Sequence, residues 1–252
     1  MYTLGIDIGS RNTKIVIWNP TSRQIIWQGY QSTEVSVASS VDKLLNLASA
    51  HCATSLISSS CVTGYGRKLY RAANKVLSEI SCHAAGCHYL YPDCRTVIDI
   101  GGQDSKIISL SSSGAVDDFV MNDKCAAGTG RFLEMTAFRL ECSLDELTHF
   151  SDQSDMDLKL NSTCVVFAES EIIGLLAEGH SSQNIAHAVY MSIAKRIYAQ
   201  MAGIDVNPAI IFTGGVAKSN HLRRCLEKLL GKSLDVPFEP EISGALGAAI
   251  LA

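Results

Sequence analysis

The chain has 252 residues, of which 47% are hydrophobic and 18% charged, and its 21 basic and 25 acidic side chains give a formal net charge of −4. At roughly 100–200 residues per domain, this length allows one large or two small domains with a substantial core. No basic block is present that could neutralise the phosphates of a nucleic acid. No apolar run approaches the roughly 20 residues that a membrane span needs. We therefore expect neither a nucleic-acid nor a membrane partner.

Nine cysteines are the unusual feature of the composition. An odd number cannot close completely into disulfides within one chain. The sequence begins Met-Tyr-Thr-Leu and passes directly into an apolar run, without the basic and apolar regions of a secretion signal. These features favour a cytoplasmic location, where thiols stay reduced and extra cysteines more often serve packing, metal binding or redox chemistry.

Apolar, β-branched runs separated by turn formers predict a β-meander at the start of the chain, with strands over 4–8, 14–18 and 24–27. A helix and a fourth strand are expected next, over 41–51 and 57–62. A second set of strands follows, over 96–102, 106–110 and 119–121. Beyond these the pattern is mainly helical, with one strand over 209–213. Its helices are predicted over 130–141, 143–148, 165–177, 182–201, 220–230 and 243–251.

Two segments about 90 residues apart repeat one pattern. Residues 5–10 read Gly-Ile-Asp-Ile-Gly-Ser and residues 98–103 read Ile-Asp-Ile-Gly-Gly-Gln, so each apolar strand carries an Asp and ends in a Gly-rich turn. A repeat of this length indicates two similar lobes rather than a solenoid, whose repeats are about 20–50 residues long. We place the boundary at a tight hinge, with an N-terminal lobe over 1–94 and a C-terminal lobe over 95–252.

Glycines at both turns allow backbone N–H groups to approach phosphate oxygens closely. The first candidate phosphate loop comprises Gly9, Ser10, Arg11, Asn12, Thr13 and Lys14. The second comprises Gly101, Gly102, Gln103, Asp104 and Lys106. A third candidate, for adenosine, comprises Gly214, Gly215 and Val216, which follow a short apolar strand and precede a helix. No Walker A motif occurs, and no G-x-G-x-x-G opens a helix after a strand.

Three polar side chains beside the two phosphate loops are the candidates for catalysis. Asp7 and Asp99 each stand two residues before a glycine at a strand end. They are placed to organise Mg²⁺ through its waters and to orient an attacking water. Gln103, beside the second loop, is the third candidate for this role.

Each motif alone is a weak signal, because an Asp-x-Gly at a strand end is most often an ordinary hairpin and glycine marks turns generally. The three in this order resemble the phosphate 1, phosphate 2 and adenosine segments of the actin, hexokinase and heat-shock ATPase superfamily. That resemblance implies an α/β fold of two ribonuclease-H-like lobes, the actin-like ATPase fold, that close on Mg-ATP.

Two further segments indicate one family within this superfamily. Residues 122–133 read Asn-Asp-Lys-Cys-Ala-Ala-Gly-Thr-Gly-Arg-Phe-Leu, and residues 162–171 read Ser-Thr-Cys-Val-Val-Phe-Ala-Glu-Ser-Glu. With these the chain resembles the ATP-dependent activators of 2-hydroxyacyl-CoA dehydratases, in the BadF/BadG/BcrA/BcrD ATPase family that also includes the ATPase subunits of benzoyl-CoA reductase. The segments 63–67, 79–84, 100–106 and 244–248 fit the same pattern, so the resemblance runs almost end to end.

The resemblance implies an iron–sulfur protein. Cys125 and Cys164 of each copy would meet across the axis of a homodimer and hold one 4Fe-4S cluster. Elementary chemistry agrees, because such clusters are held by four thiolates and two per chain require a twofold dimer. Both cysteines precede predicted helices, whose N-termini stabilise thiolates and a net-negative cluster. Oxygen sensitivity is therefore expected.

The remaining cysteines are expected to be structural. Cys82, His83, Cys87, His88 and Cys94 are dense enough to raise the question of zinc, but their spacing is unlike that of structural zinc sites. We interpret Cys82 and His83 as structural. The other four lie in apolar surroundings and are expected in the core: Cys52, Cys61, Cys142 and Cys225.

The expected function is that of an ATPase that takes one electron from a ferredoxin or flavodoxin and delivers it at low potential to a partner iron–sulfur enzyme, a 2-hydroxyacyl-CoA dehydratase. Two alternatives stay open, because this fold hosts several functions. One is the activating ATPase of a benzoyl-CoA reductase or of a double-cubane protein. The other is a small-molecule kinase of the N-acetylhexosamine type, which needs a catalytic carboxylate in a sugar pocket and no paired bridging cysteines.

Overall fold

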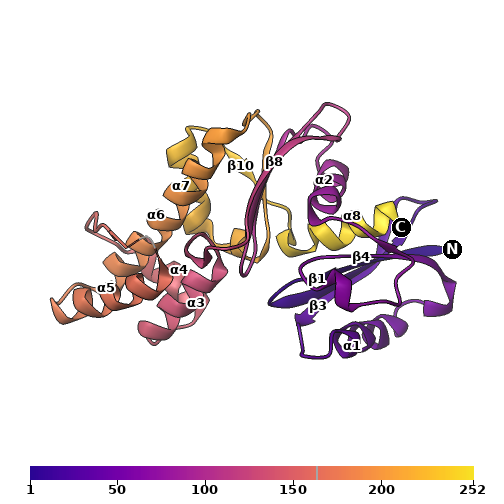
Figure 1. Ribbon diagram of the computed structural model, residues 1–252, viewed down its shortest axis with the longest axis horizontal. Coiled ribbons are helices and arrows are strands. Elements are labelled where there is room, and N and C mark those ends of the chain that lie inside the picture. Colours follow the sequence, from indigo (N-terminus) through magenta and orange to yellow (C-terminus); the bar gives the residue numbers. More distant parts are fainter. Residues whose placement is uncertain (163) are drawn as a thin grey trace. The chain divides into compact units, whose positions relative to one another are not determined.

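A computed structural model describes residues 1–162 and 164–252 (Figure 1). Thr163, which belongs to the predicted cluster-ligand motif, lies outside the described residues. The chain forms two compact units, one of residues 1–97, 108–119 and 237–252 and the other of residues 98–107 and 120–236. The C-terminal segment thus belongs to the first unit, and the lobe boundary after residue 94 stays a prediction.

The first sheet has five strands in the order β3-β2-β1-β4-β5. β1 (Tyr2–Ile8), β2 (Asn12–Asn19) and β3 (Gln24–Ser32) pair antiparallel in chain order, which confirms the predicted meander. β4 (Ile57–Thr63) and β5 (Lys75–Val76) extend the sheet in parallel. The register of β1 and β2 places Asp7 opposite Lys14.

The two faces of β2 bury alternate side chains. Ile15 and Ile17 belong to a core with α1 (Val37–Ser49), whereas Val16 and Trp18 belong to a second core with α8 (Ser243–Leu251). Successive side chains on a strand point to opposite faces. The first sheet therefore has an apolar layer on each side.

The helix α2 (Glu79–Leu90) packs closely against α8 within the first unit. A Cβ at Gly247 would lie 1.7 Å from the carbonyl oxygen of Cys82, so only glycine allows this approach. The buried residues of α2 include Ile80, Cys82 and Cys87 and do not form a single apolar stripe. This helix was not among the predicted elements.

The second sheet has the strand order β10-β9-β6-β7-β8. Its strands are β6 (Thr96–Ile100), β7 (Ser105–Leu110), β8 (Val116–Asn122), β9 (Ile210–Thr213) and β10 (Leu234–Asp235). Every residue of β6, β7 and β9 is buried, whereas β8 at the edge is mostly exposed. Continuous burial is typical of central strands covered on both faces.

Among the described residues, five α-helices belong to the second unit. They are α3 (Gly130–Arg139), α4 (Leu144–Asp152), α5 (Val165–Ala177), α6 (Ser182–Gln200) and α7 (Asn220–Leu230). Side-chain oxygens of Ser143, Ser181 and Ser219 cap α4, α6 and α7. α6 supplies the core with Ile185, Val189, Ile193 and Ile197, which recur every four residues. Within the described residues, no helix is long and apolar enough to cross a membrane.

Candidate nucleotide and cluster site

The first predicted phosphate loop is the turn between β1 and β2. The backbone N–H of Gly9 donates to the Asn12 carbonyl oxygen at 3.0 Å and closes this turn. Lys14 Nζ lies 2.9 Å from Asp7 Oδ2, and the Asp7 side chain is only 7% exposed. The predicted residues from Gly9 to Lys14 thus surround a buried carboxylate that is paired with a lysine on the next strand.

His83 lies beside the same carboxylate. A Cβ at Gly244 would lie 3.1 Å from His83 Nε2 and 3.3 Å from Asp7 Oδ2, so both polar atoms border one small space that Gly244 leaves open. His83 is buried. His83 was expected to be structural, and the packing of α2 against α8 is what brings it to the end of β1.

The second phosphate loop repeats the ion pair of the first. Lys106 Nζ lies 3.2 Å from Asp99 Oδ2 and 2.7 Å from Asp104 Oδ2, and the Lys106 side chain is 2% exposed. In each unit the Asp and its Lys are seven positions apart. The two segments that repeat in sequence therefore also repeat an Asp–Lys ion pair. At the second loop, two carboxylates and one ammonium leave a net negative charge.

The predicted adenosine segment begins where β9 ends against β6. Thr213 Oγ1 donates to Asp99 Oδ1 at 3.1 Å. Gly214 has a φ of +87°, and a Cβ there would lie 2.2 Å from the Ile100 carbonyl oxygen, so this position requires glycine. Among the described residues, no heavy atom lies within 4 Å of a Cβ built on Gly215. Val216 is 9% exposed. The backbone at Gly215 is thus open to a ligand.

Three hydrogen bonds join the second phosphate loop to the start of α3. The Gly130 N–H donates to the Gly101 carbonyl oxygen, and the Arg131 N–H donates to the Gly102 carbonyl oxygen, both at 2.9 Å. Thr129 Oγ1 donates to the Gly102 carbonyl oxygen at 3.0 Å. Movement of the loop is therefore tied to movement of the first turn of α3.

Cys125 stands four residues before Thr129. A 3-10 turn over Ala126–Gly128 separates it from α3, which differs from the predicted position at the mouth of the helix. Asn122 fixes the backbone of Cys125 on both sides, with Nδ2 donating to the Cys125 carbonyl oxygen at 2.9 Å and Oδ1 accepting from the Cys125 N–H at 3.0 Å. The thiol is free and half-buried.

Cys164 is the residue that immediately precedes α5, as expected, and its thiol is free and exposed. Glu171 holds the chain just before it by accepting from the N–H groups of Asn161 and Ser162, each at 2.8 Å. Burial opposes ionisation of Glu171, but these hydrogen bonds outweigh it and lower its pKa. Both cysteine segments are thus positioned by side chains that the sequence analysis did not single out for this purpose.

The helices that follow the two cysteines contact each other. Arg139 Nε on α3 lies 2.6 Å from Glu169 Oε1 on α5. A groove of about 550 Å³ runs beside them, and its lining includes Gln103 and Lys124 together with the exposed side chains Phe138 and Val166. The predicted catalytic Gln103 therefore faces the same groove as residues next to Cys125 and Cys164.

The two sheets and their Asp-bearing turns identify the fold class of the protein. Two sheets with helices, each with an Asp-bearing strand and a Gly-rich turn, form an actin-like ATPase fold. A solved ROK family glucokinase from Streptomyces griseus, in complex with glucose and AMPPNP, has the same fold, with a TM-score of 0.62 at 14% identity over 100% of this chain and 99% of that one. At this identity the likeness shows the fold alone.

The chain belongs to the BadF/BadG/BcrA/BcrD ATPase family, whose pattern matches residues 4–252. It is 42% identical to the activator of lactoyl-CoA dehydratase from Anaerotignum propionicum, over 100% of this chain and 97% of the relative. The solved activator of the 2-hydroxyisocaproyl-CoA dehydratase from Clostridium difficile, with bound ADPNP, has a TM-score of 0.92 at 39% identity over 100% of this chain and 94% of that one. Component A of the (R)-2-hydroxyglutaryl-CoA dehydratase from Acidaminococcus fermentans has a TM-score of 0.93 at 37% identity, over 100% of this chain and 97% of that one.

Proposed function

We propose that the protein is the activating ATPase of a 2-hydroxyacyl-CoA dehydratase. As a homodimer it binds Mg-ATP, holds one 4Fe-4S cluster through Cys125 and Cys164 of both copies, accepts an electron from a ferredoxin or flavodoxin and passes it to the dehydratase. The cluster supplies a one-electron carrier of low potential. The thiols fit this group, because both are free, neither is buried in the core, and polar side chains fix the backbone around them.

One observation carries the proposal: the hydrogen bonds from Thr129, Gly130 and Arg131 to the second phosphate loop. A nucleotide shifts an equilibrium between two conformations only if it binds one of them more tightly. Phosphates bound at Gly101 and Gly102 would favour one arrangement of this loop. Because the loop is fixed to the start of α3, the preferred arrangement would extend to the segment that contains Cys125.

The roles of the remaining site residues follow from their charge and position. Asp7 and Asp99 would hold the waters of Mg²⁺, a cation that prefers oxygen ligands and keeps several waters. Lys14 and Lys106, which pair with these carboxylates, would contact phosphate oxygens bound at the same turns. Gln103 would orient the attacking water, and the open backbone at Gly215 would lie against adenosine.

The cysteine assignment is tested by anaerobic purification of the Cys125→Ser and Cys164→Ser variants. Each should lose most of its iron and acid-labile sulfide and the brown colour of the cluster. Cys142→Ser is the matched control, since Cys142 is a half-buried free thiol of the same unit, and it should keep both. Wild-type iron and sulfide in either ligand variant would remove the assignment.

Nucleotide binding is tested separately by isothermal titration calorimetry with ATP. Heat that depends on Mg²⁺ is expected from the Asp-bearing turns. No Mg²⁺-dependent heat would contradict the nucleotide site. A colourless protein that transfers the γ-phosphate of ATP to a sugar, forming ADP and a sugar phosphate, would favour the kinase alternative.

A further inference from the structure

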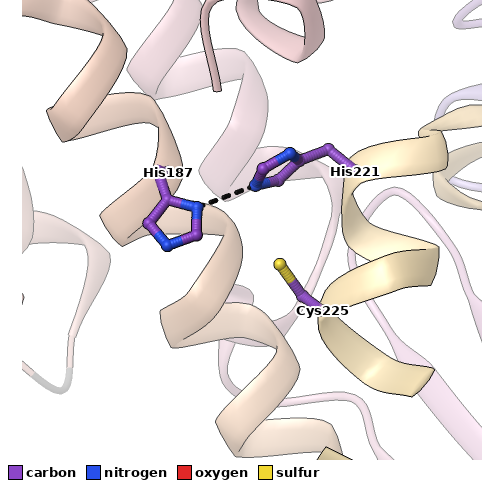
Figure 2. A group of neighbouring side chains, drawn as sticks. All are labelled: His187, His221 and Cys225. Carbon is purple, nitrogen blue, oxygen red and sulfur yellow. Dashed lines mark hydrogen bonds between the residues drawn. The ribbon is translucent and has the colours of Figure 1, made fainter. Parts of the chain in front are cut away.

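Two histidines and a cysteine gather in the second unit, on residues that the proposed function does not use. His187 lies on α6, and His221 and Cys225 lie one helical turn apart on α7. The candidate ligand atoms of the three side chains all lie within 4.8 Å of one another. Figure 2 shows a hydrogen bond between one nitrogen of each imidazole ring, with the two rings nearly perpendicular and the Cys225 thiol close to them.

The three side chains are held in place by the packing of α6 against α7. Residues 221 and 225 are four positions apart and so share one face of α7. His221 is 7% and Cys225 4% exposed, whereas His187 is half-buried. The group is therefore enclosed on the α7 side and reachable from solvent on the α6 side.

Asp152 orients His221. Its Oδ1 lies 2.6 Å from His221 Nδ1, and the same carboxylate pairs with Arg224. An ionised carboxylate accepts hydrogen bonds only, so Nδ1 of His221 carries the proton and Nε2 has the lone pair. That lone pair faces His187, whose Nδ1 lies 2.9 Å away. A carboxylate behind a histidine that presents its other nitrogen is the usual support of a metal-ligating imidazole.

The two histidines are favoured in the neutral form that binds a metal ion, whereas the Cys225 thiol must lose its proton to bind one. Burial lowers the pKa of both His187 and His221, which favours the neutral imidazole with one lone pair. Burial raises the pKa of the Cys225 thiol to about 11. An ion that binds here would displace the thiol proton and the hydrogen bond between the two rings, with the His187 proton moving to Nε2.

The spacing of the two histidine nitrogens needs little adjustment to hold an ion. In a tetrahedral site with metal–nitrogen bonds of about 2.0–2.1 Å, two nitrogens lie about 3.3 Å apart. The present 2.9 Å between His187 Nδ1 and His221 Nε2 therefore has to open by only about 0.4 Å. A change of this size is within the reach of side-chain rotation.

We propose that His187, His221 and Cys225 bind one divalent transition-metal ion of the Zn²⁺ type, at a site separate from Cys125 and Cys164. Two imidazoles and a thiolate are the ligands that such ions prefer, whereas Mg²⁺ and Ca²⁺ prefer oxygen. Three protein ligands leave the fourth tetrahedral position for water. The ion would join α6 to α7 and stabilise the second unit.

A hydrogen-bonded chain from Asp152 through His221 to His187 would explain the two histidines without any metal. Cys225 distinguishes the two interpretations, because such a chain does not need it. The test uses the full-length Cys125→Ser/Cys164→Ser protein, in which the cluster thiols cannot bind metal. Its outcome is therefore independent of the proposed function.

Co²⁺ is the probe, and Zn²⁺ is the competitor. One Co²⁺ per chain should bind, with the visible bands of tetrahedral cobalt and a thiolate-to-cobalt charge-transfer band, and Zn²⁺ should abolish both. Adding Cys225→Ser should remove the charge-transfer band, whereas adding Cys142→Ser should leave it unchanged. A spectrum unaltered by Cys225→Ser, or no Co²⁺ bound at near-equimolar concentrations, would overturn the proposal.

Two further variants guard against a loss of fold. His187→Gln changes a half-buried side chain and should weaken Zn²⁺ binding while leaving the far-ultraviolet circular dichroism of the metal-free protein unchanged. Asp152→Asn should weaken Zn²⁺ binding by about 10–100-fold, as expected for the group behind a ligating histidine. When the Zn²⁺ concentration is a hundredfold above the dissociation constant, the melting temperature of the parent Cys125→Ser/Cys164→Ser protein should rise by about 5–10 °C relative to the metal-free form. Equal affinity in both variants and the parent protein would contradict the site.

Discussion

Thr129 offers the sharpest test of the connection between the second phosphate loop and the Cys125 segment. Its hydroxyl is buried and lies 3.0 Å from the Gly102 carbonyl oxygen and 2.8 Å from the Ala126 carbonyl oxygen. Thr129→Val removes this donor and keeps the branched shape. The substitution therefore weakens the connection without opening a cavity.

The expected loss of stability is small, because both carbonyl oxygens keep another hydrogen bond after the substitution. Gly102 still accepts from the Arg131 N–H at 2.9 Å, and Ala126 still accepts from the N–H of residue 129 at 3.1 Å. The loss is thus one net hydrogen bond, about 0.5–1.5 kcal/mol. The melting temperature should fall by about 2–4 °C per kcal/mol. Because 1.4 kcal/mol corresponds to a factor of ten, the affinity for Mg-ATP should change by no more than about tenfold.

The assay compares ATP with ADP in the anaerobic, cluster-loaded protein. We expect the rate at which a chelator removes iron to differ between the two nucleotides in the wild type, and this difference to shrink in Thr129→Val. Thr136→Val is the matched control, since Thr136 is also buried on α3 but its hydroxyl donates to Phe132 within the helix, at 2.8 Å. If both variants behaved alike, or if Thr129→Val kept the full difference, the reasoning would be refuted.

Three other predictions concern packing, pH and hydrolysis. Gly247→Ala places a Cβ against the backbone of Cys82 and should lower the melting temperature by about 2–12 °C, through overpacking of about 1–3 kcal/mol. Thermal unfolding alongside Gly174→Ala, whose Cβ meets open space, checks this, and equal melting temperatures would be the contrary result. The lowered pKa of Glu171 contributes stability above its unfolded value of about 4.5, which is lost as pH falls through the folded pKa. The stability difference between wild type and Glu171→Gln in urea should therefore shrink from pH 7 to pH 4, and a constant difference would count against it. Gln103→Ala should still bind ATP but hydrolyse it more slowly, and unchanged turnover would refute its role.

Periodic elements were predictable from the sequence. The β-meander, α5 over Val165–Ala177 and α7 over Asn220–Leu230 lie where the apolar pattern places them. The repeat of Asp and glycine also indicated the two Gly-rich turns that follow Asp-bearing strands. By contrast, β5 and β10 have only two residues each, too few to form a pattern.

Other features depend on tertiary packing and leave no local pattern. α2 is buried on more than one side, so it lacks the stripe by which a surface helix is recognised. The bonds from Gly130 and Arg131 to the second phosphate loop are formed by backbone atoms, which no side-chain pattern reveals. His187 and His221 are 34 positions apart and meet only because α6 packs against α7.

The central claim is that nucleotide binding acts on a cluster held by Cys125 and Cys164. The most direct measurement is the electron paramagnetic resonance spectrum of the reduced, anaerobically purified protein, recorded without nucleotide, with Mg-ADP and with Mg-ATP. One 4Fe-4S signal for every two chains is predicted, with a shape that changes when ATP replaces ADP. A protein without iron, or a cluster signal identical in all three states, would contradict the account.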